Sequence, residues 1–170
     1  PPLIVGAAGM KSYLDQVRKE AKEKDDGVLV LDGGNFFQGN PIGMVDSGKT
    51  MVEWFEMMKY DAIVPGHYDF VFGKDNYFEL SEKFNHVKVV ASNLVSHHNL
   101  NARPYIVKDV QGVRIAILGI SNSNLSNLLM SKIKIDSEYQ AISTWLPIIK
   151  EEENPDVIIV LSSSGIPYER

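Results

Sequence analysis

The first half of the chain alternates between two hydrophobic periods. Apolar residues recur at helical spacing from Met10 to Lys24, after a glycine-rich apolar segment, 1–9, that is typical of extended chain. The unbroken apolar run 28–31 then predicts a strand buried on both faces of a parallel sheet. Helix and strand alternate twice more, with helices predicted from Thr50, whose capping-box partner is Glu53, and over 75–84, and strands over 60–64 and 87–91. This alternation predicts a parallel sheet with helical crossovers.

The pattern changes after residue 91. Strands over 105–110 and 113–120 are separated by Gln111-Gly112, which predicts a tight antiparallel hairpin. The Ser- and Asn-rich stretch 121–131 predicts a long surface loop. A last helix is predicted to begin at Asp136 or Ser137 and to kink at Pro147, and a buried strand follows over 156–161. The methionine and aromatic residues that recur at helical spacing in the helix predicted from Thr50 are typical of core packing.

Composition narrows the class of protein. The chain has 170 residues, 44% of them hydrophobic, which suits one domain that can bury a core. A net charge of −5 with no basic stripe argues against a nucleic-acid partner. The absence of cysteine excludes disulfides and thiolate metal sites, and no apolar run approaches the roughly 18 residues of a membrane span. Because the chain opens on Pro1-Pro2 without a Met, we interpret its start as processed or excerpted.

Three predicted strands end in polar clusters, namely 32–35 (Asp-Gly-Gly-Asn), 66–69 (Gly-His-Tyr-Asp) and 162–165 (Ser-Ser-Ser-Gly). Ligands of open α/β sheets bind beyond the carboxyl ends of the strands. The first cluster alone is better explained as a plain strand-to-loop turn, since its glycines let the backbone turn sharply. The second cluster likewise comes after a short apolar run and consists of a glycine followed by polar and ionisable side chains, which favours a ligand site. His97-His98 could bind metal, but adjacent side chains on a strand point to opposite faces, so we favour a solvated loop.

With these motifs the chain resembles the calcineurin-like metallophosphoesterases, specifically the 5′-nucleotidase and UDP-sugar hydrolase branch. The resemblance spans nearly all of the chain. It rests on the strand that leads into Asp32-x-Gly-x-Phe-x-Gln38-Gly39 and on the 60–62 segment before the second cluster. It also rests on the 110–115 hairpin and on the 156–160 strand. It implies an α/β fold, a metallophosphoesterase-type αββα sandwich of two mixed β-sheets flanked by helices. It also implies a divalent metal cofactor (Mn, Zn or Mg) and a nucleotide or phosphate ligand.

The chain departs from the family at the positions that carry chemistry. The family's bridging Asp corresponds to Asn35, its metal-binding Asn to His67, and a later metal-binding His to Ser163. Its phosphate-contacting His corresponds to Tyr68 and the following Glu to Asp69. The resemblance therefore assigns Asn35, His67 and Ser163 as metal positions, and Tyr68 and Asp69 as catalytic positions. An Asp-x-His motif is expected before Gly9 and a Gly-His-x-His motif after Arg170, so we expect one domain, 1–170, incomplete at both ends.

These replacements weaken a dinuclear metal site. A bridging carboxylate offsets the charge of two cations, whereas the amide oxygen of Asn35 is neutral. Serine at position 163 is a poor substitute for imidazole as a ligand of transition metals. Tyr68, with a reference pKa near 10, is less suited than His to proton transfer near neutrality. His67 could still bind a metal.

The sequence is therefore compatible with several functions. The first is a degenerate 5′-nucleotidase-like domain that lacks the dinuclear centre and acts as a binding or scaffold protein, with a possible second domain or protein partner. The alternative is an active metal-dependent hydrolase of 5′-nucleotides or nucleotide sugars with a rearranged site. A thiosulfohydrolase-like relative, whose branch resembles the His67-Tyr68-Asp69 order, and a generic α/β nucleotide-binding module rank below these. The family resemblance alone suggests an extracytoplasmic (periplasmic or surface) location.

Overall fold

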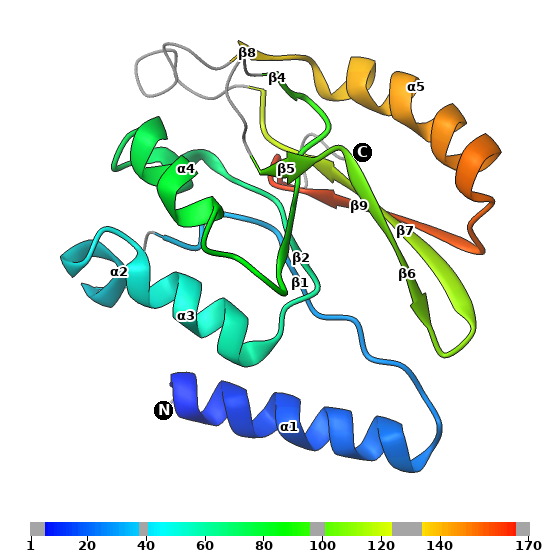
Figure 1. Cartoon of the computed structure of the whole chain (residues 1–170), viewed down its shortest axis with the longest axis horizontal. Coiled ribbons are helices and arrows are strands. Elements are labelled where there is room, and N and C mark those ends of the chain that lie inside the picture. The colour runs from blue at the N-terminus through cyan, green and yellow to red at the C-terminus, as the bar shows by residue number, and fades with distance from the viewer. Residues whose placement is uncertain (1–5, 38–40, 96–100, 124–133, 166–170) are drawn as a thin grey trace.

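The computed structural model describes residues 6–37, 41–95, 101–123 and 134–165. Helices α2 (Pro41–Val45), α3 (Lys49–Met58) and α4 (Lys74–Ser81) gather on one side of the molecule, and α5 (Glu138–Ile148) lies on the other (Figure 1). The strands lie between the two groups. This arrangement gives the α/β layering that the alternating pattern predicts.

The first sheet is parallel throughout its described strands. Its order is β1 (Leu31–Asp32), β2 (Ala62–Ile63), β3 (Lys88–Val90) and β5 (Ala102–Arg103). Helix α3 connects β1 to β2, and α4 connects β2 to β3, so the helical crossovers are confirmed. The stretch 92–104, expected to be a loop, contains β5 and also β4 (Leu94–Val95), which pairs with β8 (Lys134–Ile135). His97 and His98 lie outside the described residues.

The expectation of a doubly buried strand over 28–31 is wrong. Strand β1 covers only Leu31–Asp32, and residues 28–32 are all half-buried. Among the strands that the structure describes, β1 is the outermost of its sheet, with β2 as its neighbour, and an outermost strand is covered less than a central one. Asp61 continues the pairing beyond β1, since its N–H donates to the carbonyl of Val30 and its carboxylate accepts the N–H of Val30, each at 2.8 Å.

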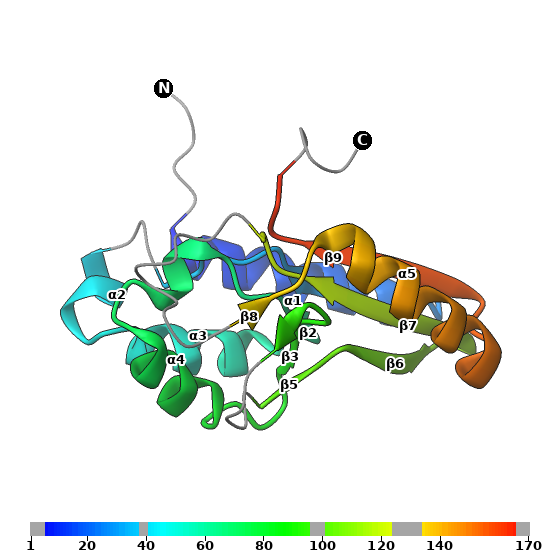
Figure 2. The same cartoon turned by 90° about the horizontal axis from the view of Figure 1, so that it is seen from above.

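The second sheet is mixed and confirms the predicted hairpin. Strands β6 (Tyr105–Val110) and β7 (Val113–Ile120) are antiparallel, and β9 (Val157–Ser162) pairs in parallel with β7. Gln111 and Gly112 both have left-handed φ, 52° and 77°, as a two-residue hairpin turn with the right twist requires. Helix α5 packs on this sheet (Figure 2), and the Ser137 hydroxyl caps it by accepting the N–H of Gln140 at 3.2 Å. A π-helical turn, Ile149–Glu153, follows Pro147 closely.

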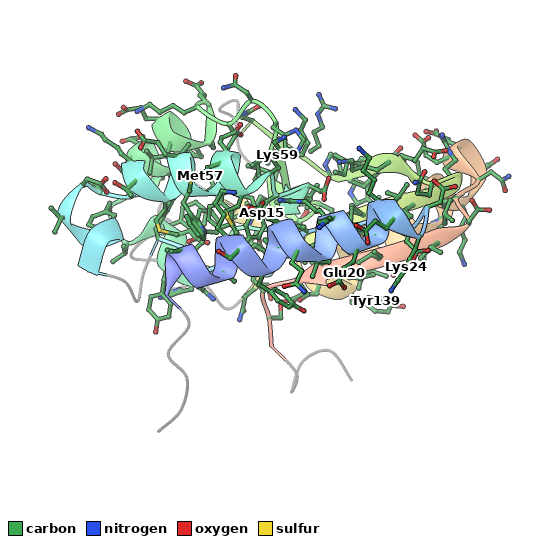
Figure 3. The ribbon with its side chains drawn as sticks, turned by 90° about the horizontal axis from the view of Figure 1, so that it is seen from below. Asp15, Glu20, Lys24, Met57, Lys59 and Tyr139 are labelled. Carbon is green, nitrogen blue, oxygen red and sulfur yellow. The ribbon has the colours of Figure 1, made fainter. Side chains whose placement is uncertain are left out.

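Two helix starts differ from the predictions. Helix α1 (Ala7–Glu23) begins inside the segment expected to be extended, with Gly6 as its N-cap. Helix α3 begins at Lys49 behind Gly48, so Thr50 lies in the first turn and is not the N-cap; its N–H and hydroxyl both donate to Asp46. Helix α1 runs across the near face in Figure 3 and contains no buried residue, although Arg18 donates to the carbonyl of Met58 at 2.6 Å.

Three buried clusters hold these layers together. The largest lies under α3 and α4 and is rich in aromatic rings in edge-to-face contact, with centroids 4.4 Å apart for Phe36 and Phe37 and 4.6 Å apart for Phe55 and Tyr60. The second joins the two sheets through buried Ala62, Val90, Ile106 and Ile117. The third lies between α5 and the second sheet. Two stacked sheets flanked by helices confirm the expected α/β sandwich.

Within the described ranges, no helix is both long enough and apolar enough to cross a membrane.

Candidate functional site

The polar clusters meet at the carboxyl ends of the strands. The ends of β7 and β9 meet at the carbonyl of Pro65, which precedes the 3-10 turn η1 (His67–Phe70) after β2, and the loop after β1 contacts η1. This carbonyl accepts the Ser121 hydroxyl at 2.9 Å and the Ser163 hydroxyl at 3.2 Å. Because Pro65 follows the first sheet and both serines follow the second, the site lies where the two sheets meet.

The side chain of Asn35, in the loop after β1, is hydrogen-bonded to the backbone of η1. It has a left-handed φ of 64°, and its Oδ1 accepts the N–H of Tyr68 at 3.0 Å. The contact requires a glycine at position 66, because a Cβ there would lie 2.8 Å from the Asn35 nitrogen. The adjacent Gly34 has a φ of +95°, and a Cβ there would lie 2.6 Å from the carbonyl oxygen of Val64. The amide oxygen of Asn35 therefore faces protein backbone.

Asp69 is fully buried beneath this loop. Its carboxylate accepts the N–H groups of Asn35 at 2.8 Å, Phe37 at 3.0 Å and Gly66 at 2.7 Å. Burial raises the pKa of Asp69 to about 7, against the opposing effect of the three N–H donors, which favour the ionised form. The nearby charge of Asp32 raises it further. The geometry makes Asp69 the group that joins η1 to the loop after β1.

Asp32 is a second carboxylate at the same edge. It is half-buried, and its Oδ1 accepts the N–H of Gly34 at 2.8 Å. Burial raises the pKa of Asp32, and the Gly34 hydrogen bond opposes this shift. Asp32 and Asp69 thus share one small region in which the ionised form of either carboxylate disfavours ionisation of the other.

His67 and Tyr68 form the solvent-facing part of the site. Their rings are 5.0 Å apart and nearly perpendicular, at 82°. Tyr68 is 47% exposed and His67 is half-buried. Both side chains are therefore accessible to a ligand above the strand ends, whereas Asp69 is not.

The hydroxyl of Ser163 is engaged within the protein. Besides donating to Pro65, it accepts the N–H of Asn122 at 3.0 Å, and the Ser163 N–H donates to the carbonyl of Ile120 at 3.0 Å. Ser163 thereby holds the ends of β7 and β9 against the first sheet.

The residues present do not fit a pair of divalent cations. In the part of the chain that the structure describes, no three His, Cys, Asp or Glu side chains are grouped so that they could hold a metal ion. The three predicted ligands, Asn35, His67 and Ser163, supply no negative charge, and a dinuclear site needs anionic ligands to offset two dications. Two of these side chains already bond to backbone. These residues therefore do not support a mechanism that uses two metal ions.

Sequence reasoning missed three residues that support the site. Ser121, expected in a surface loop, is fully buried, so that part of the expectation is wrong. Asn93 is also buried and holds it, accepting the Ser121 N–H at 2.8 Å and donating to its carbonyl at 2.7 Å. Glu138 accepts the Ser123 hydroxyl at 2.6 Å and the Ser164 hydroxyl at 3.2 Å. Only the position of Glu138 directly after a helix N-cap Ser could have drawn attention to it.

No family model matches the chain, but individual proteins do. It is 24% identical over 169 residues to Protein UshA of Yersinia enterocolitica and 22% identical over 169 residues to a 5′-nucleotidase of Vibrio cholerae. Both matches cover 94% of this chain and 30% of the relative. The chain thus spans about a third of the length of the curated relatives that it matches.

Solved structures share the fold. The NAD nucleotidase of Haemophilus influenzae matches with a TM-score of 0.82 at 20% identity, covering 98% of this chain and 30% of that one. A sulfate thiohydrolase, SoxB, of Thermus thermophilus matches at 0.80 and 17% identity, covering 93% and 29%. A 5′-nucleotidase precursor from Thermus thermophilus matches at 0.79 and 23% identity, covering 92% and 31%.

Proposed function

We propose that the chain is a degenerate relative of the 5′-nucleotidase branch of the calcineurin-like metallophosphoesterases, a proposal that its similarity to Protein UshA and to 5′-nucleotidases supports. In this proposal the domain lacks the dinuclear metal centre and acts by binding a ligand or a partner. The observation that carries the proposal is the bonding of Asn35. Its amide oxygen and its own N–H are both satisfied by η1, through Tyr68 and Asp69. The loop therefore keeps its conformation without a cation.

Charge supports the same conclusion. A carboxylate at position 35 would stand beside Asp69, whose pKa is already raised by burial and, to a smaller extent, by the charge of Asp32. Without bound cations, three neighbouring carboxylates would repel one another, and the neutral amide of Asn35 avoids that cost. Asn35 is thus suited to a site that is stable when no metal is bound.

The ligand that fits this edge is a phosphate or a nucleotide. Tyr68 and His67 present a hydroxyl and an imidazole to solvent beside each other, and both groups can donate hydrogen bonds to phosphate oxygens. We further propose that the domain acts with a second domain or a protein partner, and outside the cytoplasm, as the family resemblance implies. The alternative is an active hydrolase of 5′-nucleotides or nucleotide sugars in which His67 serves a rearranged metal site.

The first experiment measures metal content and phosphate release together. The chain is incubated with Mn, Zn or Mg and with AMP or UDP-glucose, and bound metal is counted by elemental analysis. We expect no pair of tightly bound metals and no metal-dependent turnover. Two tightly bound metals per chain, or robust turnover that His67→Ala abolishes, would favour the alternative and overturn the proposal.

A restoration experiment tests the residue correspondences themselves. The triple variant Asn35→Asp, Tyr68→His, Ser163→His restores the family's residue types at three positions, and we expect it to bind divalent metal more tightly than the parent chain. The matched control is Tyr139→His, which adds an imidazole at a position that is 82% exposed. If the triple variant binds no more metal than this control, the correspondences are wrong.

A further inference from the structure

A second site lies away from the polar strand ends. A pocket of about 690 Å³ opens at the residues that precede β2 and β3 and extends along β6. Asp61 and Lys88 line it from the beginnings of β2 and β3, whereas the candidate site lies beyond the carboxyl ends of strands. Pockets for small ligands are typically about 300–1,000 Å³. The volume therefore suits a small molecule.

The pocket carries positive charge that the described residues leave uncompensated. Its two acidic side chains are already paired, Asp61 with Lys108, and Glu153 with Arg114 at 2.6 Å. Lys88 donates to the carbonyl of Asn85 at 2.7 Å and has no acidic partner among the residues that the structure describes. The side chain of Arg103, at the end of the edge strand β5, has no hydrogen bond or ion pair with any residue that the structure describes.

Lys88 and Arg103 can act on the same anion. Val90 of β3 pairs with Arg103 of β5 in the sheet register, and side chains two residues apart on a strand share a face. Lys88 and Arg103 therefore lie on one face of the first sheet, on neighbouring strands. A guanidinium that is free to make two parallel N–H···O bonds, beside an ammonium, is a binding arrangement for a carboxylate or a phosphate.

Two aromatic side chains also line this pocket. Tyr105 of β6 and Trp145 of α5 both line the pocket, with ring centroids 5.9 Å apart and planes inclined at 59°. Both rings are half-buried, and the Tyr105 hydroxyl donates to Glu153 at 3.2 Å, which fixes its orientation. A planar ring can pack against such a pair by offset or edge-to-face contact.

We propose that this pocket binds a small aromatic anion, a planar ring carrying a carboxylate or a phosphate group. The ring packs on Tyr105 and Trp145, and the anionic group binds Arg103 and Lys88. This site is separate from the one around Asn35, and the two can be tested independently. Carboxylate and phosphate ligands share this chemistry, so the test includes one of each.

Trp145 supplies a reporter within the pocket. The chain has two tryptophans, and the other, Trp54, packs against the large core cluster under α3. In a Trp54→Phe background, tryptophan fluorescence comes from Trp145 alone. The probes are AMP and nicotinate, which combine a ring with an anion, adenosine, which lacks the anion, and inorganic phosphate, which lacks the ring. We expect AMP or nicotinate, or both, to change the fluorescence saturably, at concentrations at which adenosine and phosphate have little effect.

Two matched variants test the role of charge. Arg103→Gln should weaken binding of the responding probe by about tenfold or more, as loss of a charge-assisted hydrogen bond does. Lys24→Gln removes the same charge at the end of α1 (Figure 3) and should leave binding unchanged. A thermal transition for each variant confirms that it is folded. The Asn35→Asp variant should bind the probe normally, because the pocket and the strand-end site are distinct.

Three outcomes would overturn the proposal. The fluorescence could stay unchanged with both AMP and nicotinate at millimolar concentration. Lys24→Gln could weaken binding as much as Arg103→Gln, which would show general charge attraction. Adenosine or phosphate alone could bind as tightly as the combined probes, which would show that ring and anion are not recognised together. None of these outcomes bears on the proposal for Asn35, which metal content and turnover test.

Discussion

The backbone N–H of Asn35 donates to Oδ2 of Asp69 at 2.8 Å, across 34 positions of sequence. The same carboxylate oxygen accepts the N–H of Gly66 at 2.7 Å, and Oδ1 accepts the N–H of Phe37 at 3.0 Å. One buried side chain thus fixes both loops that carry the candidate site.

Replacing the Asp69 carboxylate should destabilise the fold. In Asp69→Asn an NH₂ group replaces one oxygen and faces a backbone N–H, so at least one buried donor loses its acceptor. We expect the free energy of unfolding to fall by about 1–3 kcal/mol, measured by urea denaturation. The control is Asp15→Asn on α1, where the carboxylate is exposed and paired with Lys11, and the change should be within about 0.5 kcal/mol. Equal stability of the two variants would contradict this role for Asp69.

Stability should depend on pH through the same group. The pKa of Asp69 is raised from its ordinary 3.8 to about 7, chiefly by burial, so the folded chain holds the proton more tightly than the unfolded chain. This contribution to stability is complete below about pH 3.8 and is lost as the pH rises through about 7. Asp32, whose pKa is also raised, acts in the same direction.

The measurement is the urea midpoint across this pH range for the parent chain and for Asp69→Asn. We expect the decline in the midpoint between about pH 4 and about pH 7 to be smaller in the variant, because the residue no longer titrates. Parallel curves for the two proteins would show that Asp69 titrates alike in the folded and the unfolded chain.

Glycine should be required at position 66 and not at position 33. A Cβ at residue 66 would lie 2.8 Å from the Asn35 nitrogen, a backbone atom that cannot move without breaking its bond to Asp69. At Gly33 the nearest atom would be the carbonyl oxygen of Ser162 at 3.5 Å, an ordinary contact. We expect Gly66→Ala to lower the thermal transition and Gly33→Ala, the control, to leave it nearly unchanged. Equal tolerance at both positions would mean that the two loops are not in close contact.

A carboxylate at position 35 should be unfavourable without metal. In Asn35→Asp the new carboxylate would lie beside Asp69 and near Asp32, so like charges would repel above neutrality. We expect a lower thermal transition than in the parent chain, and a larger difference at higher pH. Ser143→Asp, at an exposed position of α5, controls for the added charge. A variant that is as stable as the parent in a chelator would remove the charge argument for Asn35.

Local sequence patterns were enough to predict the main helices and strands and the positions of the polar clusters. The hairpin over 105–120 was predictable because alternation and Gln111-Gly112 are local features, and the clusters at 32–35 and 66–69 were visible as polar breaks after apolar runs. The family resemblance added the sandwich of two sheets, which the fold and the solved structures confirm.

Which polar groups meet, and which are buried, depends on the packing of segments that are distant in sequence. Ser163 reaches Pro65 across 98 positions, and Ser121, in a stretch that is polar by composition, is fully buried because Asn93 satisfies its backbone. Among the described strands β1 is the outermost of its sheet and is half-buried, and hydrophobic pattern does not encode that position. The physical reason is that a local pattern sets backbone conformation, whereas hydrogen bonding and burial depend on neighbours that are distant in sequence.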